Sequence, residues 1–502
     1  MKSLIAYSLS LILAATPVLS ASAAQGMDQV RLPAIGEPAG SGELSPEEER
    51  RIGEQSMVQI RNSRFYLDDL DVSEYLNRLG YRLVAMAPSN SYGFQFFPLK
   101  VPEINAFALP GGFIAVFSGT VLAASDESEL AGVMAHEIAH VTQRHIARMF
   151  ERQKGTGALA LGSFLLAILA AAAGGSSGGN AASAIVMGSQ AAMISNQLKF
   201  SRSAEQEADR IGFQILTRAG YDPRGMVRFF QRLQQQSGSY DSSNSYLSDH
   251  PLTIERIGDM ENRARNYPQS FRKSDDFDFL LIQARLLVLQ GDRTADWEEA
   301  VRQLRLRLVG RSSGEQAAAA HYGLSVAYRQ MGRAAVAYEE AEKAAAAAGG
   351  RKSVFIDKNL CETRFLAAGS EVEKEAALAQ MRRLCDQNPV SSMTAGAYIE
   401  ALRSMGRYEE ILRYLKTQGA FSQDNPAYYR YYAQSSEALG RHSESHLAIG
   451  RMYALQGEWK QAAIQFHEAE KASDGDFYTM SEIDARLREA EARMKDEEGG
   501  SR

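Results

Sequence analysis

The segment "MAHEIAHVTQRH", residues 134–145, constrains this chain more than any other, because it holds three of the chain's eight histidines within ten positions. It predicts a helix from about residue 127 to residue 150. Residues four apart share one face of a helix, so His136 and His140 project side by side, which suits two imidazoles on one Zn²⁺ ion. Glu137 lies one step round the helix, where it can take a proton from a water that the metal activates for attack on a peptide carbonyl.

A second segment, "FSRSAEQEADRIGFQIL" at residues 200–216, supplies the third ligand that such a site needs. Glu205 and Asp209 are four apart on a second predicted helix, so both can face the first. Glu205 completes a set of two histidines and one glutamate and leaves the fourth position open for water or substrate. Asp209 accepts the spare N–H of a ligand histidine and fixes its tautomer. A salt-bridged surface helix is the alternative for this acidic pair taken alone.

Two further polar residues, His250 and Arg256, are each open to more than one interpretation. His250, after a Ser-rich loop and before a proline, either donates to the developing oxyanion, or occupies the open zinc position, or has no role; we predict that it closes the site and restrains activity. Arg256 either stabilises the tetrahedral intermediate or is an ordinary surface arginine. His145, five residues past the second histidine ligand, is expected to be exposed, and Glu207 is expected to be solvated.

The run "NAFALPGGFIAVFSG" precedes the predicted zinc helix and reads as short strands around a Gly-Gly turn. Peptidases commonly bind substrate as an added strand on an exposed sheet edge, which reads the backbone and tolerates many sequences. We expect residues 105–116 to form that edge.

The second half of the chain repeats pairs of helices around glycines. Gly332, Gly406, Gly440 and Gly457 each separate two helical patterns in which small Ala and large Tyr recur at helical spacing. Gly406 and Gly440 are 34 residues apart, the period of a tetratricopeptide (TPR) unit. Because such units bury a face only by stacking on their neighbours, a helical solenoid is predicted.

The N-terminal residues 1–24 predict a cleaved secretory signal peptide. An apolar run follows Lys2, and "ASA" at residues 21–23 fits a cleavage site. The alternative is an uncleaved anchor, but the run falls short of the ~20 residues that a membrane span needs. We therefore expect the mature protein to act outside the cytoplasm, with residues 25–44 flexible.

Charge and composition limit the partners. The formal net charge is -6 with no basic block, which argues against nucleic-acid binding.

The apolar, Gly-rich insert at residues 155–194 is either a lid on the enzyme or an element that makes peripheral contact with a membrane or a partner. Cys361 and Cys385 either form one disulfide or are two buried free thiols.

At this point three motifs resemble a known family. "INAFALPGGFIAVFSG", "HEIAH" and "SRSAEQEAD", with the later His250 and Arg256, resemble the Ste24/HtpX family of zinc metallopeptidases over roughly residues 45–265. That family has the gluzincin fold. The resemblance implies one Zn²⁺ held by His136, His140 and Glu205, catalysis by Glu137 and a supporting role for Asp209.

The signal peptide and the TPR-like tail narrow the resemblance to family members that act on outer-membrane proteins in the periplasm of Gram-negative bacteria. It implies stalled or misfolded outer-membrane proteins as substrates, and docking of the tail on the outer-membrane barrel-assembly machinery. Membrane-embedded family members carry clear transmembrane helices; none is evident here, so we expect a soluble or peripheral enzyme.

The predicted fold is mainly α. A gluzincin-type α+β metallopeptidase domain with a small sheet at residues 45–268 is followed by an α-helical TPR solenoid at residues 272–495. The predicted function is a secreted zinc endopeptidase for quality control of outer-membrane proteins, with a chaperone role in their assembly. The alternative is a TPR chaperone or scaffold whose zinc site is mostly idle.

Overall fold

A computed structural model describes residues 44–88, 92–152, 200–237, 246, 250–267, 276–417, 419–421, 423 and 425–499. The predicted signal peptide, the apolar insert and most of the Ser-rich loop lie outside these residues. Residues 41–502 form one compact unit, so the boundary near residue 270 stays a prediction from the sequence. The described helices include none long and apolar enough to cross a bilayer.

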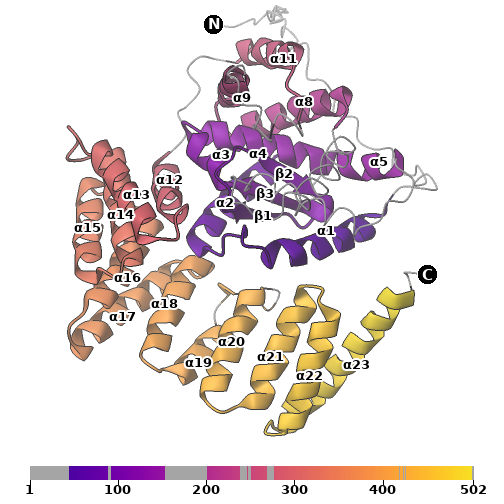
Figure 1. Cartoon of the computed structure of the whole chain (residues 1–502), viewed down its shortest axis with the longest axis vertical. Helices are drawn as coiled ribbons and strands as arrows, with labels where there is room; N and C mark the ends of the chain where they lie inside the picture. The colour runs from indigo at the N-terminus through magenta and orange to yellow at the C-terminus, as the bar shows by residue number, and fades with distance from the viewer. Residues whose placement is uncertain are drawn as a thin grey trace, which may run out of the picture. The chain divides into compact units, whose positions relative to one another are not determined.

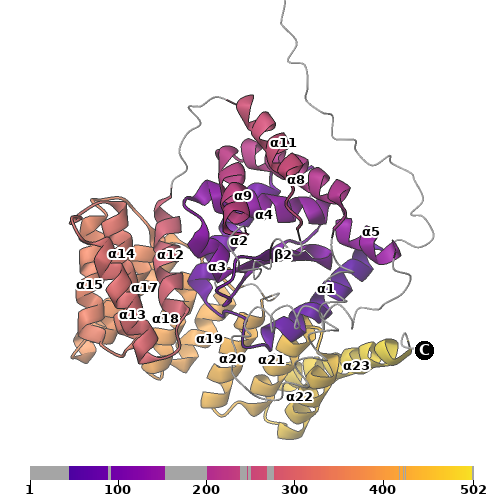
Figure 2. The same cartoon turned by 45° about the horizontal axis from the view of Figure 1, so that its top comes forward.

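The first half of the described chain is a small sheet enclosed by helices (Figures 1 and 2). Its elements are α1 (Pro46–Arg61), α2 (Leu70–Val84), β1 (Gln95–Leu99), β2 (Ala106–Leu109), the 3₁₀ turn η1 (Pro110–Gly112), β3 (Phe113–Phe117), α3 (Ser118–Ala123), α4 (Glu127–Thr142), α5 (His145–Arg152), α8 (Arg202–Arg218), α9 (Arg224–Ser237) and α11 (Ile254–Arg265). This arrangement confirms the predicted α+β domain with a small sheet.

The sheet has the strand order β1-β3-β2, with β3 parallel to β1 and antiparallel to β2. Residues 105–116 therefore do not all lie at an edge, because β3 is paired on both sides; of the two strands in this range, only β2 lies at an edge. The outer edge of β1 is covered by Asn77, whose amide accepts from the Phe96 N–H at 3.1 Å and donates to the Phe96 carbonyl at 2.7 Å. In the described part of the sheet, β2 has no strand partner other than β3.

Helix α4 is the centre of this half, because every residue from Glu127 to Val141 is buried. It packs against α8 and α9 on one side and against α2 and β2 on the other. The single helix predicted to residue 150 is in fact two, since α4 ends at Thr142 and α5 starts at His145. Arg144 between them has a left-handed backbone, with φ of 53°, and this turns the chain.

The second half is a series of helices that follow one another in antiparallel pairs (Figure 1). They are α12 (Phe277–Leu289), α13 (Thr294–Arg307), α14 (Glu315–Gln330), α15 (Ala334–Ala347), α16 (Val354–Ala367), α17 (Glu371–Gln387), α18 (Ser392–Ser404), α19 (Tyr408–Thr417), α20 (Pro426–Ala438), α21 (His442–Leu455), α22 (Trp459–Ala472) and α23 (Phe477–Gly499). The predicted TPR-type solenoid is confirmed.

The four glycines singled out in the sequence each end a helix in this half. Gly332, Gly406, Gly440 and Gly457 have left-handed φ values between 70° and 80°. After each one, the next amide donates to the carbonyl five residues back, as Arg407 does to Leu402 at 3.0 Å. This closes the helix end and turns the chain sharply enough for the next helix to pack back on it.

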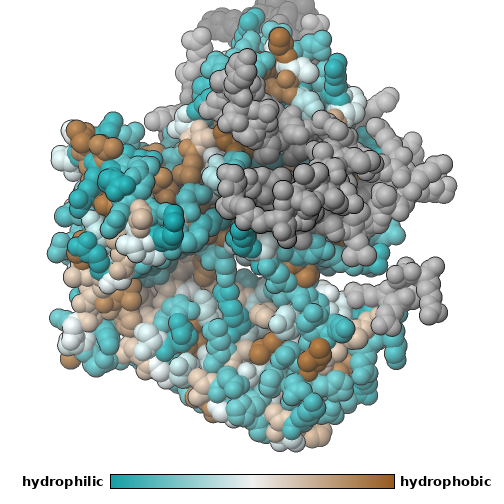
Figure 3. Space-filling model, in the orientation of Figure 1, coloured by the Kyte–Doolittle hydropathy of each residue, from teal (hydrophilic) through white to brown (hydrophobic). Residues whose placement is uncertain are grey.

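Consecutive repeats bury their apolar faces on one another, as the cluster around Ile399, Leu402 and Ile411 shows. The surface seen in Figure 3 is mostly hydrophilic over these helices, with hydrophobic residues in small separate groups.

Cys361 and Cys385 are both free thiols in this structure, and burial raises the pKa of Cys361 to about 11. The thiols are therefore free, as in the second of the two interpretations, but only Cys385 is buried and Cys361 is half-buried.

Candidate metal centre

Two neighbouring helices bring the predicted ligands together. Helix α4 carries His136 and His140, and α8 carries Glu205 in its first turn after the N-cap Ser201. The helices approach closely at Gly212, where a Cβ atom would lie only 3.0 Å from the His136 amide nitrogen. A glycine at that point allows α8 to pack near enough for Glu205 to reach the histidines.

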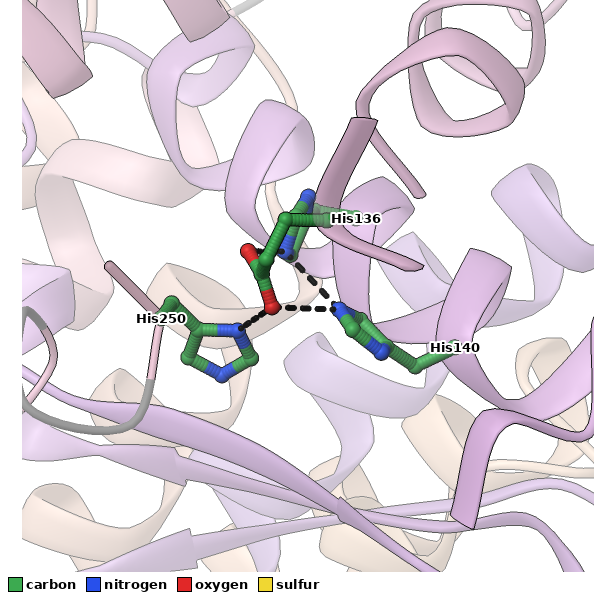
Figure 4. A group of neighbouring side chains, drawn as sticks. His136, His140 and His250 are labelled. Atoms are coloured by element: carbon green, nitrogen blue, oxygen red, sulfur yellow. Dashed lines mark hydrogen bonds and ion pairs between the residues drawn. The ribbon is translucent and has the colours of Figure 1, made fainter. Parts of the chain in front are cut away.

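In Figure 4 the imidazoles of His136, His140 and His250 surround one carboxylate, that of Glu205. The Nε2 atom of His140 lies 3.1 Å from Nε2 of His136 and 3.5 Å from Oε1 of Glu205. His136 Nε2 lies 3.5 Å from the other carboxylate oxygen. One ligand atom from each of the four side chains lies within 4.8 Å of the other three, and all four side chains are buried.

These separations fit a bound metal ion. Two ligands at about 2.0–2.1 Å from a tetrahedral zinc are roughly 3.3 Å apart. The Nε2 atoms of His136 and His140 are 3.1 Å apart, and each lies 3.5 Å from a different oxygen of the Glu205 carboxylate, Oε2 for His136 and Oε1 for His140. Two imidazole nitrogens and one carboxylate oxygen are also a donor set that zinc accepts at catalytic sites. His136, His140 and Glu205 would therefore hold the ion, with His250 on the remaining side.

Asp209 and Arg256 lie behind His136. Asp209 Oδ1 is 3.1 Å from His136 Nδ1, the ring nitrogen that faces away from the cluster. Arg256 donates to both oxygens of Asp209, at 2.7 and 2.8 Å, and its Nη1 lies 2.7 Å from Glu205 Oε2. Arg256 is only 2% exposed, so it is not an ordinary surface arginine. Its charge faces two carboxylates, that of the ligand Glu205 and that of Asp209, which contacts the ligand His136.

Comparison with known proteins gives the family. The model of peptidase family M48 matches residues 71–264. The beta-barrel assembly-enhancing protease of Escherichia coli (strain K12) is 31% identical over 490 residues, which are 92% of each chain. The chain belongs to peptidase family M48. This confirms the resemblance seen in the sequence, and the chain is a metallopeptidase.

Two other similarities accompany this M48 assignment. A putative beta-barrel assembly-enhancing protease of Vibrio cholerae is 40% identical over 291 residues, which are 56% of this chain and 58% of that protein. A solved tetratricopeptide repeat protein from Parabacteroides merdae covers 52% of this chain and 98% of its own, at 12% identity and a TM-score of 0.28. At that score the likeness carries no argument, and the repeats rest on the helices and glycine turns described above.

The electrostatics of the M48 site favour metal-binding protonation states for two of the three ligands. Burial alone would raise the pKa of Glu205, but the histidines around it, His250 first, lower it well below its usual value. Burial lowers the pKa of His140, so its imidazole stays neutral. Burial would lower the pKa of His136 too, but hydrogen bonds to Asp209 and Glu205 raise it to about 9, so metal must displace a proton there.

His250 lies inside the cluster. Its Nδ1 is 3.0 Å from Glu205 Oε1, and its Nε2 is 3.6 Å from Glu137 Oε1. The ring is 1% exposed and stacks between Tyr246 and Phe200, with centroid distances of 4.8 and 5.5 Å. The sequence did not single out either aromatic residue, because a ring that covers a site has no spacing signal of its own.

His145 and Glu207 correct two expectations. His145 is 4% exposed rather than surface-lying, and its Nδ1 is 3.1 Å from Nδ1 of His140. Its Nε2 is 3.1 Å from Glu207 Oε2, so Glu207 also has a partner. The expectation failed because it continued α4 past Thr142, whereas the left-handed residue Arg144 folds His145 back toward the ligands.

Proposed function

We propose that this M48 metallopeptidase is a periplasmic zinc endopeptidase that degrades misfolded or stalled outer-membrane proteins. The observation that carries the chemistry is the buried set of His136, His140 and Glu205, with Glu137 adjacent on α4. The name of the relatives, beta-barrel assembly-enhancing protease, supports the substrate class, and the predicted signal peptide supports the compartment.

The residues of the site have separate roles in the proposed reaction. Zinc, when bound, would act as a Lewis acid on a water and on the peptide carbonyl. Glu137 accepts the proton of the attacking water on its carboxylate and returns it to the departing amine nitrogen. Asp209 holds His136 in one tautomer, and Arg256 keeps Asp209 and Glu205 in place by charge.

The substrate is proposed to bind along β2. This strand packs on α4, which carries the ligands, and among the described residues its outer side pairs with no other strand. An extended peptide paired with β2 would present its backbone to the metal ligands. Any unfolded segment satisfies that requirement, which suits an enzyme that removes failed folding products.

His250 is proposed to hold the site closed. Its ring lies against Glu205 and near Glu137, on the side where water and the substrate carbonyl must enter. His250→Ala should raise the cleavage rate of an unfolded substrate such as casein. A lower rate would assign His250 to catalysis, for example as a donor to the oxyanion, and an unchanged rate would remove both roles.

The repeats are proposed to dock the enzyme on the outer-membrane barrel-assembly machinery. Stacked helix pairs offer an extended surface for protein partners. The same feature favours a second function, in which the repeats hold outer-membrane clients as a chaperone and proteolysis is secondary.

Glu137→Gln tests the proposal. It keeps the side-chain volume and the three ligands, so one zinc per chain should remain by elemental analysis. Loss of the general base should lower casein cleavage by at least ~10²-fold. Glu47→Gln, an exposed change in the first turn of α1, is the matched control and should behave as wild type.

The same variant separates the two functions. In a strain that lacks the gene, Glu137→Gln should fail to restore outer-membrane integrity if proteolysis is the main role. Full complementation by Glu137→Gln would instead make the chaperone role the principal one.

A further inference from the structure

The turn between α4 and α5 has an unusual backbone that the proposed mechanism does not use. Arg144 lies in the left-handed region, with φ of 53°, which side-chain-bearing residues rarely adopt. Its guanidinium is held by the buried carboxylate of Glu49, at 2.7 and 2.9 Å, and by the Leu44 carbonyl. These contacts from the start of α1 fix a conformation that the turn would otherwise not favour.

The consequence of this turn is the position of the His145 ring. It lies under His140, with ring centroids 4.9 Å apart and planes at 76°. Its two nitrogens face different partners at hydrogen-bond distance, since Nδ1 is 3.1 Å from His140 Nδ1 and Nε2 is 3.1 Å from Glu207 Oε2. A straight continuation of α4 would have carried this side chain away from both.

The contacts assign the ring protons along the series His140, His145 and Glu207. His140 directs Nε2 at the other ligands, so its Nδ1 carries the hydrogen when Nε2 offers a lone pair. A carboxylate only accepts, so Glu207 takes the Nε2–H of His145. His145 is then left with a lone pair on Nδ1, and this accepts the Nδ1–H of His140. All three groups are satisfied in a single arrangement.

We propose that His145 and Glu207 are positioning residues that orient His140 for the metal and fix its tautomer. They do for His140 what Asp209 and Arg256 do for His136. This inference rests on the proposed metal site, but it assigns a role to two residues outside the ligand set. Partners of this kind typically change metal affinity by about 10–100-fold when removed.

Three substitutions at one position test the proposal. The amide of asparagine reaches as far as the imidazole Nδ1, so His145→Asn keeps an acceptor for His140 and loses Glu207. The amide of glutamine reaches as far as Nε2, so His145→Gln keeps Glu207 and loses His140. Zinc affinity, measured by competition with a chelator, should fall about 10–100-fold in His145→Ala and His145→Gln, and His145→Asn should recover most of it.

Opposite results overturn the inference. Should His145→Gln recover the affinity and His145→Asn not, His145 only ties α5 to α8. Should His145→Ala bind zinc within about twofold of wild type, the residue has no part in the site. Thermal melts accompany each titration; if His145→Ala fails to fold, the comparison of the asparagine and glutamine variants still decides. His467→Asn, at an exposed histidine, is the matched control.

Glu207→Gln gives an independent check. It removes the charge but keeps an acceptor oxygen for His145, so zinc affinity should fall only a few-fold, and combination with His145→Ala should add nothing further. Additive losses would contradict a shared chain of hydrogen bonds. Failure of the proposed function looks different, because wild-type protein would then bind no zinc, or Glu137→Gln would cleave casein at the wild-type rate.

Discussion

The orientation of His136 depends on an acidic residue that never touches the ligand face. Asp209 lies 3.1 Å from His136 Nδ1 and is 2% exposed. Burial alone would raise the pKa of Asp209, but the hydrogen bonds from Arg256 and His136 lower it, so it stays ionised. A charged acceptor at this place keeps the hydrogen of His136 on Nδ1 and leaves Nε2 for the metal.

Asp209→Asn should therefore weaken metal binding with little change of shape. Either orientation of the new amide weakens the contact with His136, and Arg256 loses a counter-charge. We expect zinc affinity to fall about 10–100-fold, or ~1.4–2.7 kcal/mol. Chelator competition measures it, with the exposed Asp259→Asn as control. Unchanged affinity would show that Asp209 does not orient the ligand.

At the scale of single residues, helical spacing correctly predicted the residues that lie within regular helices. It missed the residue whose position depends on an irregular turn. The four-residue steps from His136 to His140 and from Glu205 to Asp209 indicated the correct faces, since both pairs lie within unbroken helices. His145 was missed because its position depends on a left-handed arginine. No local pattern marks such a residue, because a distant carboxylate on α1 stabilises it.

At the scale of elements, the site depends on how closely α8 approaches α4. A Cβ at Gly212 would lie 3.0 Å from the His136 nitrogen and 3.1 Å from atoms of Ala135. Backbone atoms cannot swing aside as a flexible side chain does. The distance between these two helices therefore sets the distance between Glu205 and the histidines.

Gly212→Ala should push α8 outward and separate the ligands. We expect a loss of about 1–3 kcal/mol of stability from overpacking, together with weaker zinc binding. Gly258→Ala is the matched control, because it also lies within a helix but its Cβ would meet nothing within 4 Å. That change should stabilise the protein by about 0.5–1 kcal/mol. Thermal melts and zinc titrations of both variants would decide, and equal effects would refute the close-contact argument.

Elements were predicted where a local signal was strong. Helical spacing marked α4 and α8, and the glycine turns marked the repeats. The strand edge was predicted less well, because residues 105–116 include both β2 and β3, and pairing decides which of them is at the edge. Strand β3 pairs with β1, although β2 and η1 lie between these two strands in the sequence. No local sequence pattern indicates that pairing.

At the scale of the whole molecule, α2 joins the two halves through buried charges. Asp71 on α2 lies 2.6 Å from Lys358 Nζ on α16 and 3.4 Å from Arg285 Nη2 on α12. Arg285 also donates to both oxygens of Asp69, at 2.8 and 2.6 Å. Asp71 is 1% exposed, so these cations have little water to replace it.

Asp71→Asn should therefore weaken the attachment of the repeats to the peptidase half. Asparagine has nearly the same shape, but it removes the nearer of two carboxylates from the buried Lys358, which keeps Glu362 at 3.2 Å. Removal of one partner of a buried ion pair typically costs about 3–5 kcal/mol. Asp68→Asn breaks an exposed ion pair between the same halves, with Arg430, and should cost no more than about 1 kcal/mol. Denaturant unfolding of both variants measures the difference.

The pH dependence of stability gives a second test of these buried ion pairs. Burial alone would raise the pKa of Asp71, but Arg285 and Lys358 lower it to about 2, against an ordinary value of 3.8. A depressed pKa stabilises the folded state at pH values above 3.8, and this stabilisation is lost as pH falls toward 2. The shift corresponds to roughly 2–3 kcal/mol. The stability gap between wild type and Asp71→Asn should be constant above about pH 5 and should narrow by that amount toward pH 2. A gap that stays constant across this range would mean that the charge of Asp71 does not hold the two halves together.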